Sequence, residues 1–278
     1  MLWEKGVEVF DAHRDENFRL RALLFTTIQD YPAYGNLSGY TVKGETACPI
    51  CEDGMKGKWL NASGKMVYLC HRRYLPHNHS YRKQKKAFNG EQEFRRRPTI
   101  LSGEEVFEKV KNIKLSFGKT KENKKSIPSK GYKKCSIFWS LPYWQYLFVR
   151  HSLDVMHIEK NVCDSLIGTL LNIPGKSKDG IKARKDMKQL GIRKELHVIK
   201  NENRRYLPPA AYTLSRNEKV KLCESLAGIK VPEGYSSNIR NLVSLEDLKL
   251  VGLKSQYCHV LMQQLLSVAI RFNLPKNV

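Results

Sequence analysis

The apolar residues near the start of the chain form two short runs separated by charged residues. Val7 to Phe10 is the first run, and Leu20 to Ile28, rich in β-branched and aromatic side chains, is the second. Residues 7–30 are therefore predicted to form a strand, a turn and then either a second strand or a buried helix. Residues 31–40 contain Pro, Gly, Asn and Ser at high density, and this composition predicts a loop.

The most apolar part of the chain, residues 137–175, contains a segment with helical spacing. Apolar side chains recur there every three or four residues, at Val155, Ile158, Val162, Leu166 and Leu170. Pro174 and Gly175 then supply a stop, so we expect a helix over about residues 154–172.

Three further helices are predicted in segments that are less apolar. Residues 101–114 carry apolar positions at helical spacing, and Ser102 with Glu105 is arranged like a capping box. Another helix is expected from Arg216 to Ala227, followed by a turn at 232–235, and a last one from about Cys258 to Phe272.

Residues 44–82 contain too many turn residues and too few apolar ones to form an ordinary core. The segment contains a Cys-x-x-Cys pair at Cys48 and Cys51, and a tight turn can bring two such sulfurs to one tetrahedral Zn²⁺. We predict a structural zinc site completed by His71 and His79. Cys70 and His77 are alternative ligands for that second half of the site. The Cys pair could instead be a redox pair or two free thiols.

The chain is strongly basic, with 49 Lys+Arg against 27 Asp+Glu and a formal net charge of +22. Such an excess attracts polyanions and releases counterions from a phosphate backbone, so nucleic acid is the leading partner. A solvated basic surface or an acidic protein partner are the alternatives. The candidate DNA contacts fall in two basic runs, 82–97 and 119–134, the second of which is predicted to be a disordered linker. These contacts are Arg82, Lys83, Lys85, Lys86, Arg95, Arg96, Arg97, Lys124, Lys125, Lys133 and Lys134.

The seven cysteines are an odd number, and four of them stand singly among residues predicted to be helix or core. A complete disulfide framework is therefore not expected, and a reducing compartment fits better. The charged start of the chain lacks the apolar region of a signal peptide, and no apolar stretch is long enough to span a membrane. We expect a soluble, intracellular protein.

A few polar residues are candidates for binding a metal ion. Asp154, His157 and Asn161 share one face of the predicted helix, where Asp and His could bind a metal. Asp154 could equally be the N-cap, with His157 an ordinary buried histidine. Asp11 ends the first apolar run, where two-metal nucleases often hold Mg²⁺, although a lone Asp there is more often a turn residue.

Several longer segments resemble the plant CACTA (En/Spm) transposase family. They include YPAYGNLSGYTVKGETACPIC, HRRYLPHNHSYR, LDVMHIEKNVCDSLIGTLLNIPG and LKSQYCHVLMQQLLSVAIR. The resemblance implies cut-and-paste transposition by an RNase H-like domain with an Asp/Asp/Glu triad, two divalent ions (Mg²⁺ or Mn²⁺) and an inserted Cys-x-x-Cys motif. By this resemblance Asp11 is similar to the second Asp of the triad, and Asp154 with His157 to a DxxH signature.

The resemblance also has gaps. The first Asp of the triad is expected upstream of this chain, in a motif like TDGxNPF, and the final Glu is expected downstream or at a position that no motif identifies. Gln256 and Tyr257 stand where the family more often has His and Asp, which suggests a decayed copy. A site that lacks carboxylates cannot hold two metals for in-line displacement.

The sequence as a whole predicts an α+β fold. We expect a fragment of an RNase H-like transposase core with a zinc-binding insertion and a mainly helical C-terminal half. The expected divisions are 1–43 (core segment), 44–82 (zinc insertion), 83–134 (basic linker), 135–252 (helical segment) and 253–278 (start of a helical domain). The expected function is that of a transposon-derived, nuclear, DNA-binding protein that is catalytically incomplete, with transposon ends and other transposase subunits as partners. The alternatives are a zinc-stabilised protein-interaction module without a DNA role, or an active metal-dependent DNA strand transferase.

Overall fold

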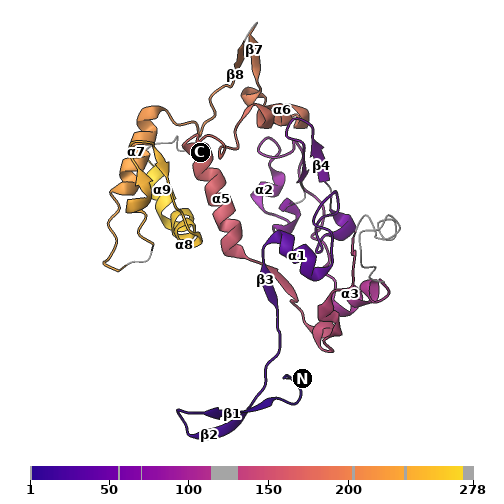
Figure 1. Cartoon of the computed structure of the whole chain (residues 1–278). Helices are drawn as coiled ribbons and strands as arrows, with labels where there is room; N and C mark the ends of the chain where they lie inside the picture. Colours follow the sequence, from indigo (N-terminus) through magenta and orange to yellow (C-terminus); the bar gives the residue numbers. More distant parts are fainter. Residues whose placement is uncertain are drawn as a thin grey trace, which may run out of the picture. The chain divides into compact units, whose positions relative to one another are not determined.

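The computed structural model describes residues 2–55, 57–69, 71–113, 131–201, 204–234 and 237–271 (Figure 1). The chain forms two compact units. The first contains residues 1–42, 48–50 and 100–153, and the second contains 43–47, 51–99 and 154–278. Each unit is thus assembled from segments that are far apart in sequence, rather than from the consecutive divisions that the sequence suggested.

The first unit contains two small sheets. The strand expected at the first apolar run is confirmed as β1 (Val7–Asp11), and it forms an antiparallel hairpin with β2 (Glu16–Leu20), which lies where a turn was predicted. The second apolar run is not one continuous element, because only β3 (Thr27–Gln29) is a strand and residues 21–26 are irregular. β3 pairs in parallel with β6 (His151–Leu153), a strand more than a hundred residues later.

The predicted loop at residues 31–40 is wrong, because helix α1 (Tyr31–Ser38) occupies most of it. The Asp30 carboxylate accepts a hydrogen bond from the Ala33 backbone N–H and caps the helix, and Pro32 lies in its first turn. Gly39 ends it in the left-handed conformation at φ 80°. The turn-forming residues therefore serve to start and stop a short helix.

The helix predicted within residues 101–114 is confirmed as α3 (Gly103–Val110). Its capping box is complete, since Ser102 and Glu105 each bond to the other's backbone N–H. Val110 of α3 is fully buried in the first unit, as is Trp144. The Trp144 ring stacks on Phe138 at 4.9 Å, so the short 3₁₀ turns at Ile137–Ser140 and Trp144–Tyr146 carry part of this unit's core.

The second unit begins with short elements around the Cys/His region and continues with most of the helices of the described chain. The early elements are β4 (Gly57–Leu60), β5 (Lys65–Tyr68), the 3₁₀ turns Glu52–Gly54 and His71–Tyr74, and α2 (Ser80–Lys83). The later ones are α5 (Val155–Leu170), α6 (Ile181–Leu190), β7 (Ile199–Asn201), β8 (Arg204–Tyr206), α7 (Arg216–Ala227), β9 (Val243–Ser244), β10 (Lys249–Leu250), α8 (Ser255–Val260) and α9 (Leu266–Ile270). Short 3₁₀ turns also occur at Lys194–Leu196 and Arg240–Leu242.

The helices expected at 154–172 and 216–227 are confirmed as α5 and α7, and both are capped by the side chain that precedes them. The last helix starts earlier than expected, at Ser255, and a π turn at Leu261–Leu265 separates α8 from α9. Phe272, its expected end, lies outside the described residues. None of the helices in the described part of the chain combines the length and the apolar character needed to cross a bilayer.

The buried face of α5 coincides with only part of the predicted apolar stripe, of which Leu170 is buried. Val155, Ile158 and Val162 are 65%, 44% and 49% exposed, whereas Cys163 and Ile167 are buried. These two side chains belong to a core formed with α7 and α8, to which Leu222, Leu226, Cys258 and Leu261 contribute. Spacing alone identified the helix, but the partner helices determine which side of it is covered.

The charged stretch after α5 contains a helix that the sequence did not reveal. Helix α6 carries a buried carboxylate, Asp186, which accepts hydrogen bonds from the Ala62 backbone N–H and the Ser63 hydroxyl. Gln189 of the same helix bonds to the backbone of Asn61 and Trp59. These polar contacts hold the β4–β5 hairpin against α6, so this hairpin is fixed by hydrogen bonds as well as by apolar burial.

Candidate nucleic-acid and metal-binding sites

Asp154 is the N-cap of α5. Its carboxylate accepts a hydrogen bond from the backbone N–H of His157 at 3.2 Å, and the His157 residue is exposed. The structure therefore supports the capping role that the sequence left open for Asp154, and His157 is not a buried histidine.

Asp11 lies at the turn of the β1–β2 hairpin. Its Oδ1 accepts hydrogen bonds from the backbone N–H groups of His13, at 2.9 Å, and Arg14, at 3.2 Å. A carboxylate that bonds to the next residues of its own turn is a turn-stabilising residue. Asp11 belongs to the first unit, whereas Asp154 belongs to the second.

A third aspartate, Asp30, was missed by the sequence reasoning. The last residue pair of the parallel β3–β6 sheet is Gln29 with Leu153, and an aspartate follows each of them in the sequence: Asp30 and Asp154. The carboxyl ends of parallel strands are the usual location of ligand and catalytic groups in α/β folds. The sequence does contain a signal for a helix start here, an Asp directly before Tyr-Pro. The prediction of a loop at residues 31–40 did not take it into account.

Two side chains on neighbouring helices form an acid–base pair that the sequence also did not indicate. Oε2 of Glu159 on α5 lies 2.7 Å from Nδ1 of His259 on α8, and both side chains remain partly open to solvent. The two helices also pack against each other through the core around Cys163 and Cys258. The pair therefore lies at the edge of an established helix contact.

The predicted zinc ligands are not gathered in one place among the described residues. The Cys51 sulfur is 2.7 Å from the Tyr74 hydroxyl, and Nδ1 of His79 accepts a hydrogen bond from the Tyr81 N–H. The His71 ring packs at 5.7 Å from Phe88. In the described part of the chain no three His, Cys, Asp or Glu side chains form a group that could hold a metal ion. Cys70 lies outside the described residues, so the zinc site stays a prediction.

Cysteines in the described ranges form no disulfides. Cys163 and Cys258 are fully buried, and burial raises the pKa of the Cys163 thiol to about 12. A thiol with so high a pKa is inert, so these residues serve as small apolar side chains.

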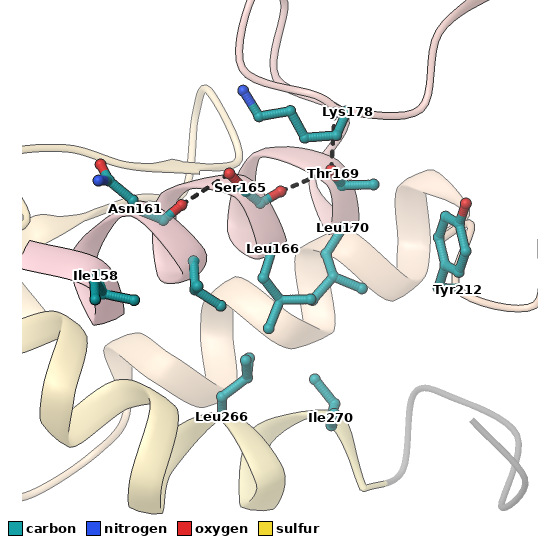
Figure 2. A pocket seen from close by; sticks show the side chains of 11 residues that line it. Ile158, Asn161, Ser165, Leu166, Thr169, Leu170, Lys178, Tyr212, Leu266 and Ile270 are labelled. Carbon is teal, nitrogen blue, oxygen red and sulfur yellow. Dashed lines mark hydrogen bonds between the residues drawn. The ribbon is translucent and has the colours of Figure 1, made fainter. Parts of the chain in front are cut away.

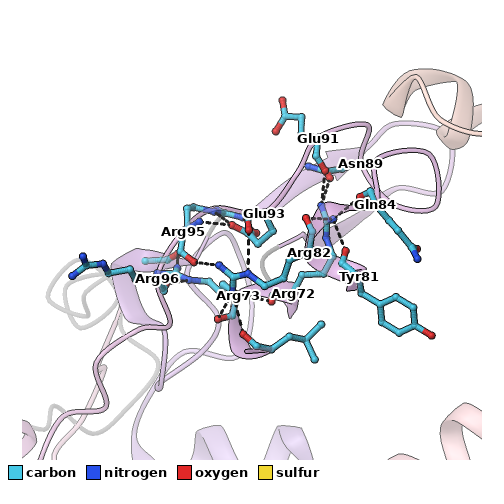
Figure 3. Close-up of polar contacts among 12 residues, drawn as sticks. Arg72, Arg73, Tyr81, Arg82, Gln84, Asn89, Glu91, Glu93, Arg95 and Arg96 are labelled. Atoms are coloured by element: carbon cyan, nitrogen blue, oxygen red, sulfur yellow. Dashed lines mark hydrogen bonds and ion pairs between the residues drawn. The ribbon is translucent and has the colours of Figure 1, made fainter. Parts of the chain in front are cut away.

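Residues 71–97 are organised around two buried arginines, Arg72 and Arg82, which are 2% and 3% exposed (Figure 3). Arg72 donates to the backbone carbonyls of Tyr81, Gln84 and Glu91, and its guanidinium lies 4.3 Å from the centre of the Phe88 ring. The backbone itself thus supplies acceptors for this buried charge, which would otherwise be costly.

Arg82 makes a similar set of bonds. It donates to the carbonyls of Arg72, Arg73, Leu75, Glu93 and Arg95. The structure therefore assigns Arg82 a role inside the fold, instead of the surface contact with DNA that the sequence suggested. Arg95 also has an internal partner, because its guanidinium forms a two-pronged ion pair with the Glu93 carboxylate.

The other predicted cations of this segment point outward. Lys83, Lys85, Lys86, Arg96 and Arg97 are all exposed. Two aromatic side chains, Tyr81 and Phe94, are 52% and 70% exposed within the same segment. Lys133 is exposed and Lys134 half-buried in the first unit, while Lys124 and Lys125 lie outside the described residues. Lysines, arginines and exposed rings on a hydrogen-bonded scaffold are the groups that bind phosphates and bases.

The second unit contains an apolar groove of about 860 Å³ between α5 and α9 (Figure 2). Its walls include Leu166, Leu170, Leu266 and Ile270. The hydroxyl groups that border it are already used, since Ser165 donates to the Asn161 carbonyl and Thr169 to that of Ser165. The groove therefore offers apolar contact area and has no arrangement of acid, base and nucleophile for catalysis.

Comparison with known proteins finds a similarity for the first part of the chain. Residues 1–113 match a transposase family model. The particular family is described as transposase family tnp2. This match includes Asp11, Asp30 and the whole Arg72–Arg82 segment, but it ends before α5 and Asp154. No curated protein and no solved structure matches the chain.

Proposed function

We propose that this chain is a transposon-derived protein of the CACTA (En/Spm) type from a plant, and that it binds DNA and is catalytically incomplete by itself. The observation that carries the DNA-binding part is the exposed set of cations around the buried Arg72 and Arg82. The tnp2 match over the same residues supports the relation to transposases. We assign its action to the nucleus, since its proposed partner is chromosomal DNA, and in particular transposon ends.

The buried arginines explain why this surface suits a phosphate backbone. Each guanidinium ties several carbonyls of residues 72–95 together, so the segment is fixed before DNA arrives. Cations on a fixed segment lose less conformational freedom on binding than cations on a flexible tail. The expected binding is independent of DNA sequence and falls steeply with salt, because it rests on phosphate contacts.

A salt titration with two matched variants tests this proposal. The first variant replaces Lys83, Lys85 and Lys86 by Gln. The control replaces the three exposed lysines of α6, Lys182, Lys185 and Lys188, by Gln, and so removes the same charge elsewhere.

We expect the first variant to lower the slope of log affinity against log salt by about 2 to 3, since each lost phosphate contact contributes about 0.9. The α6 variant should bind nearly as the parent protein does. Equal losses in both variants would mean that only net charge matters. A flat salt dependence in the parent would favour the alternative, a zinc-stabilised protein-interaction module.

The proposed catalytic incompleteness rests on the acidic residues. Phosphodiester displacement at two metals needs several converging carboxylates, and Mg²⁺ keeps its waters where the ligands are not pre-arranged. Asp11 is bonded to its own turn, and the described residues contain no group of three potential metal ligands. We therefore expect no strand cleavage or transfer when the purified chain is incubated with Mg²⁺ or Mn²⁺ and DNA carrying CACTA-type terminal repeats.

One observation favours the second candidate, an active metal-dependent strand transferase. Asp30 directly follows β3, a strand of the parallel pair. Cleavage that requires Mg²⁺ and is lost in both Asp30→Asn and Asp154→Asn, but kept in Asp11→Asn, would establish this alternative and remove the claim of incompleteness. Absence of cleavage in the parent supports the first candidate.

A further inference from the structure

The first unit contains a small cavity that none of the predicted sites uses. Its volume is about 190 Å³, and it lies between α1, α3 and the segment that leads into β6. Apolar and aromatic side chains form much of its wall, and Tyr34, Tyr132, Arg150 and His151 add polar groups. Pockets for drug-sized molecules span about 300–1,000 Å³, so this cavity suits a single ring system.

Arg150 brings a positive charge to the cavity. One guanidinium nitrogen donates to the Leu147 carbonyl at 2.8 Å, and the guanidinium lies 5.7 Å from the Trp139 ring. No carboxylate of the described residues pairs with it. Burial lowers the pKa of Arg150. A half-buried cation without a counter-charge favours an anionic ligand.

Two titratable neighbours, Tyr34 and His151, do not supply that anion. Burial raises the pKa of Tyr34 to about 12, so its hydroxyl stays protonated. Burial lowers the pKa of His151 to about 4, so its ring is neutral at pH 7, and its Nδ1 lies 2.6 Å from the Thr27 hydroxyl. Both residues therefore face the cavity as neutral hydrogen-bonding groups.

An almost fully exposed ring stands at the same cavity. Phe148 lines it and is 88% exposed. Such exposure is costly for a phenylalanine in water, and exposed aromatic faces are surfaces on which unpaired bases stack. A base that is stacked inside a duplex cannot reach the Phe148 ring. Proteins that bind a single base in a pocket need that base to be out of the stack.

We propose that this cavity binds one unpaired nucleotide of DNA, with the base stacked on Phe148 and its phosphate bound by Arg150. This site rests on the proposed DNA-binding function and deepens it. The basic surface around Arg82 would hold the duplex backbone, and the Phe148 cavity would add preference for DNA with a single-stranded end or a flipped base.

The test compares the full chain binding to a blunt duplex and to the same duplex with a short single-stranded overhang. Phe148→Ala removes the stacking face, and because the side chain is exposed the fold should be unaffected. Tyr146→Ala is the matched control, since Tyr146 is an aromatic residue of the same segment, is 68% exposed and does not line the cavity. Phe148→Trp keeps a stacking face.

We expect the parent to bind the overhang DNA more tightly than the blunt duplex. Phe148→Ala should lower the affinity for the overhang DNA about tenfold and leave the affinity for the blunt duplex unchanged. Phe148→Trp and Tyr146→Ala should behave as the parent. A 2-aminopurine in the overhang should be quenched on binding in the parent and not in Phe148→Ala.

Three results overturn the inference. If blunt and overhang DNA bind equally, or if Phe148→Ala and Tyr146→Ala lose the same affinity, the cavity is not a nucleotide site, although the proposed DNA binding stands. If neither DNA binds, the proposed function fails and the nucleotide site fails with it.

Discussion

Replacing Arg82 by Met should open the segment between residues 72 and 95, although the sequence alone marks Arg82 as one more surface cation. Methionine fills much of the same space but donates no hydrogen bonds. The change removes five hydrogen bonds to backbone carbonyls, among them those of Glu93 at 3.1 Å and Arg95 at 2.6 Å.

The size of the effect follows from these contacts. A hydrogen bond to a charged group contributes about 1.5–3 kcal/mol, so five bonds would exceed about 7 kcal/mol by simple addition. Such values are not additive when the groups share one network. The freed carbonyls can also recover water once the segment loosens. We therefore expect a local destabilisation of about 3–4 kcal/mol.

Hydrogen exchange of the backbone amides measures this directly, because a chain with two units need not unfold in one step. A loss of about 3 kcal/mol should speed exchange in residues 72–95 by about two orders of magnitude. Arg96→Met is the control, since Arg96 is exposed and its side chain can be cut back without touching this network. Equal exchange rates in Arg82→Met and Arg96→Met would refute the structural role of Arg82.

Three further outcomes can be checked. Burial, with the nearby Arg150, lowers the pKa of His151 from 6.5 to about 4, so the unfolded chain binds a proton first. As the pH falls from about 6.5 to about 4, the free energy of unfolding should decrease by about 1–2 kcal/mol, a value discounted because the ring is partly solvated. Denaturation at several pH values measures this slope, and His151→Gln should lose it. Gly39→Ala should destabilise the first unit by about 2 kcal/mol or more, since its Cβ would lie 2.2 Å from the Lys134 carbonyl oxygen, whereas Gly44→Ala, with φ 89° and open space, should cost less. Metal analysis should find about one Zn²⁺ per chain, lost in Cys51→Ser, and less than about 0.2 equivalents would contradict the zinc site.

Local signals in the sequence determined several elements of this protein. The capping box at Ser102 and Glu105 marks the start of α3, and Asp154 marks the start of α5. These signals work because a cap satisfies backbone groups within three or four residues of itself, so distant contacts are not needed. The strand at Val7–Asp11 was predictable from its own short apolar run, but its partner β2 lies where the sequence predicted a turn.

The tertiary structure decided what depends on distant partners. The pairing of β3 with β6 is what makes Asp30 a strand-end residue. Ile167 is buried in the core that α5 shares with α7 and α8, whereas Ile158 is exposed. Arg82 and Arg96 look alike in the sequence, yet one is buried among carbonyls and the other is exposed. The physical reason is that two free energies depend on distant parts of the chain: the cost of burying a charge and the stabilisation from burying an apolar side chain. The groups that decide both come from elsewhere in the sequence, and local spacing does not encode them.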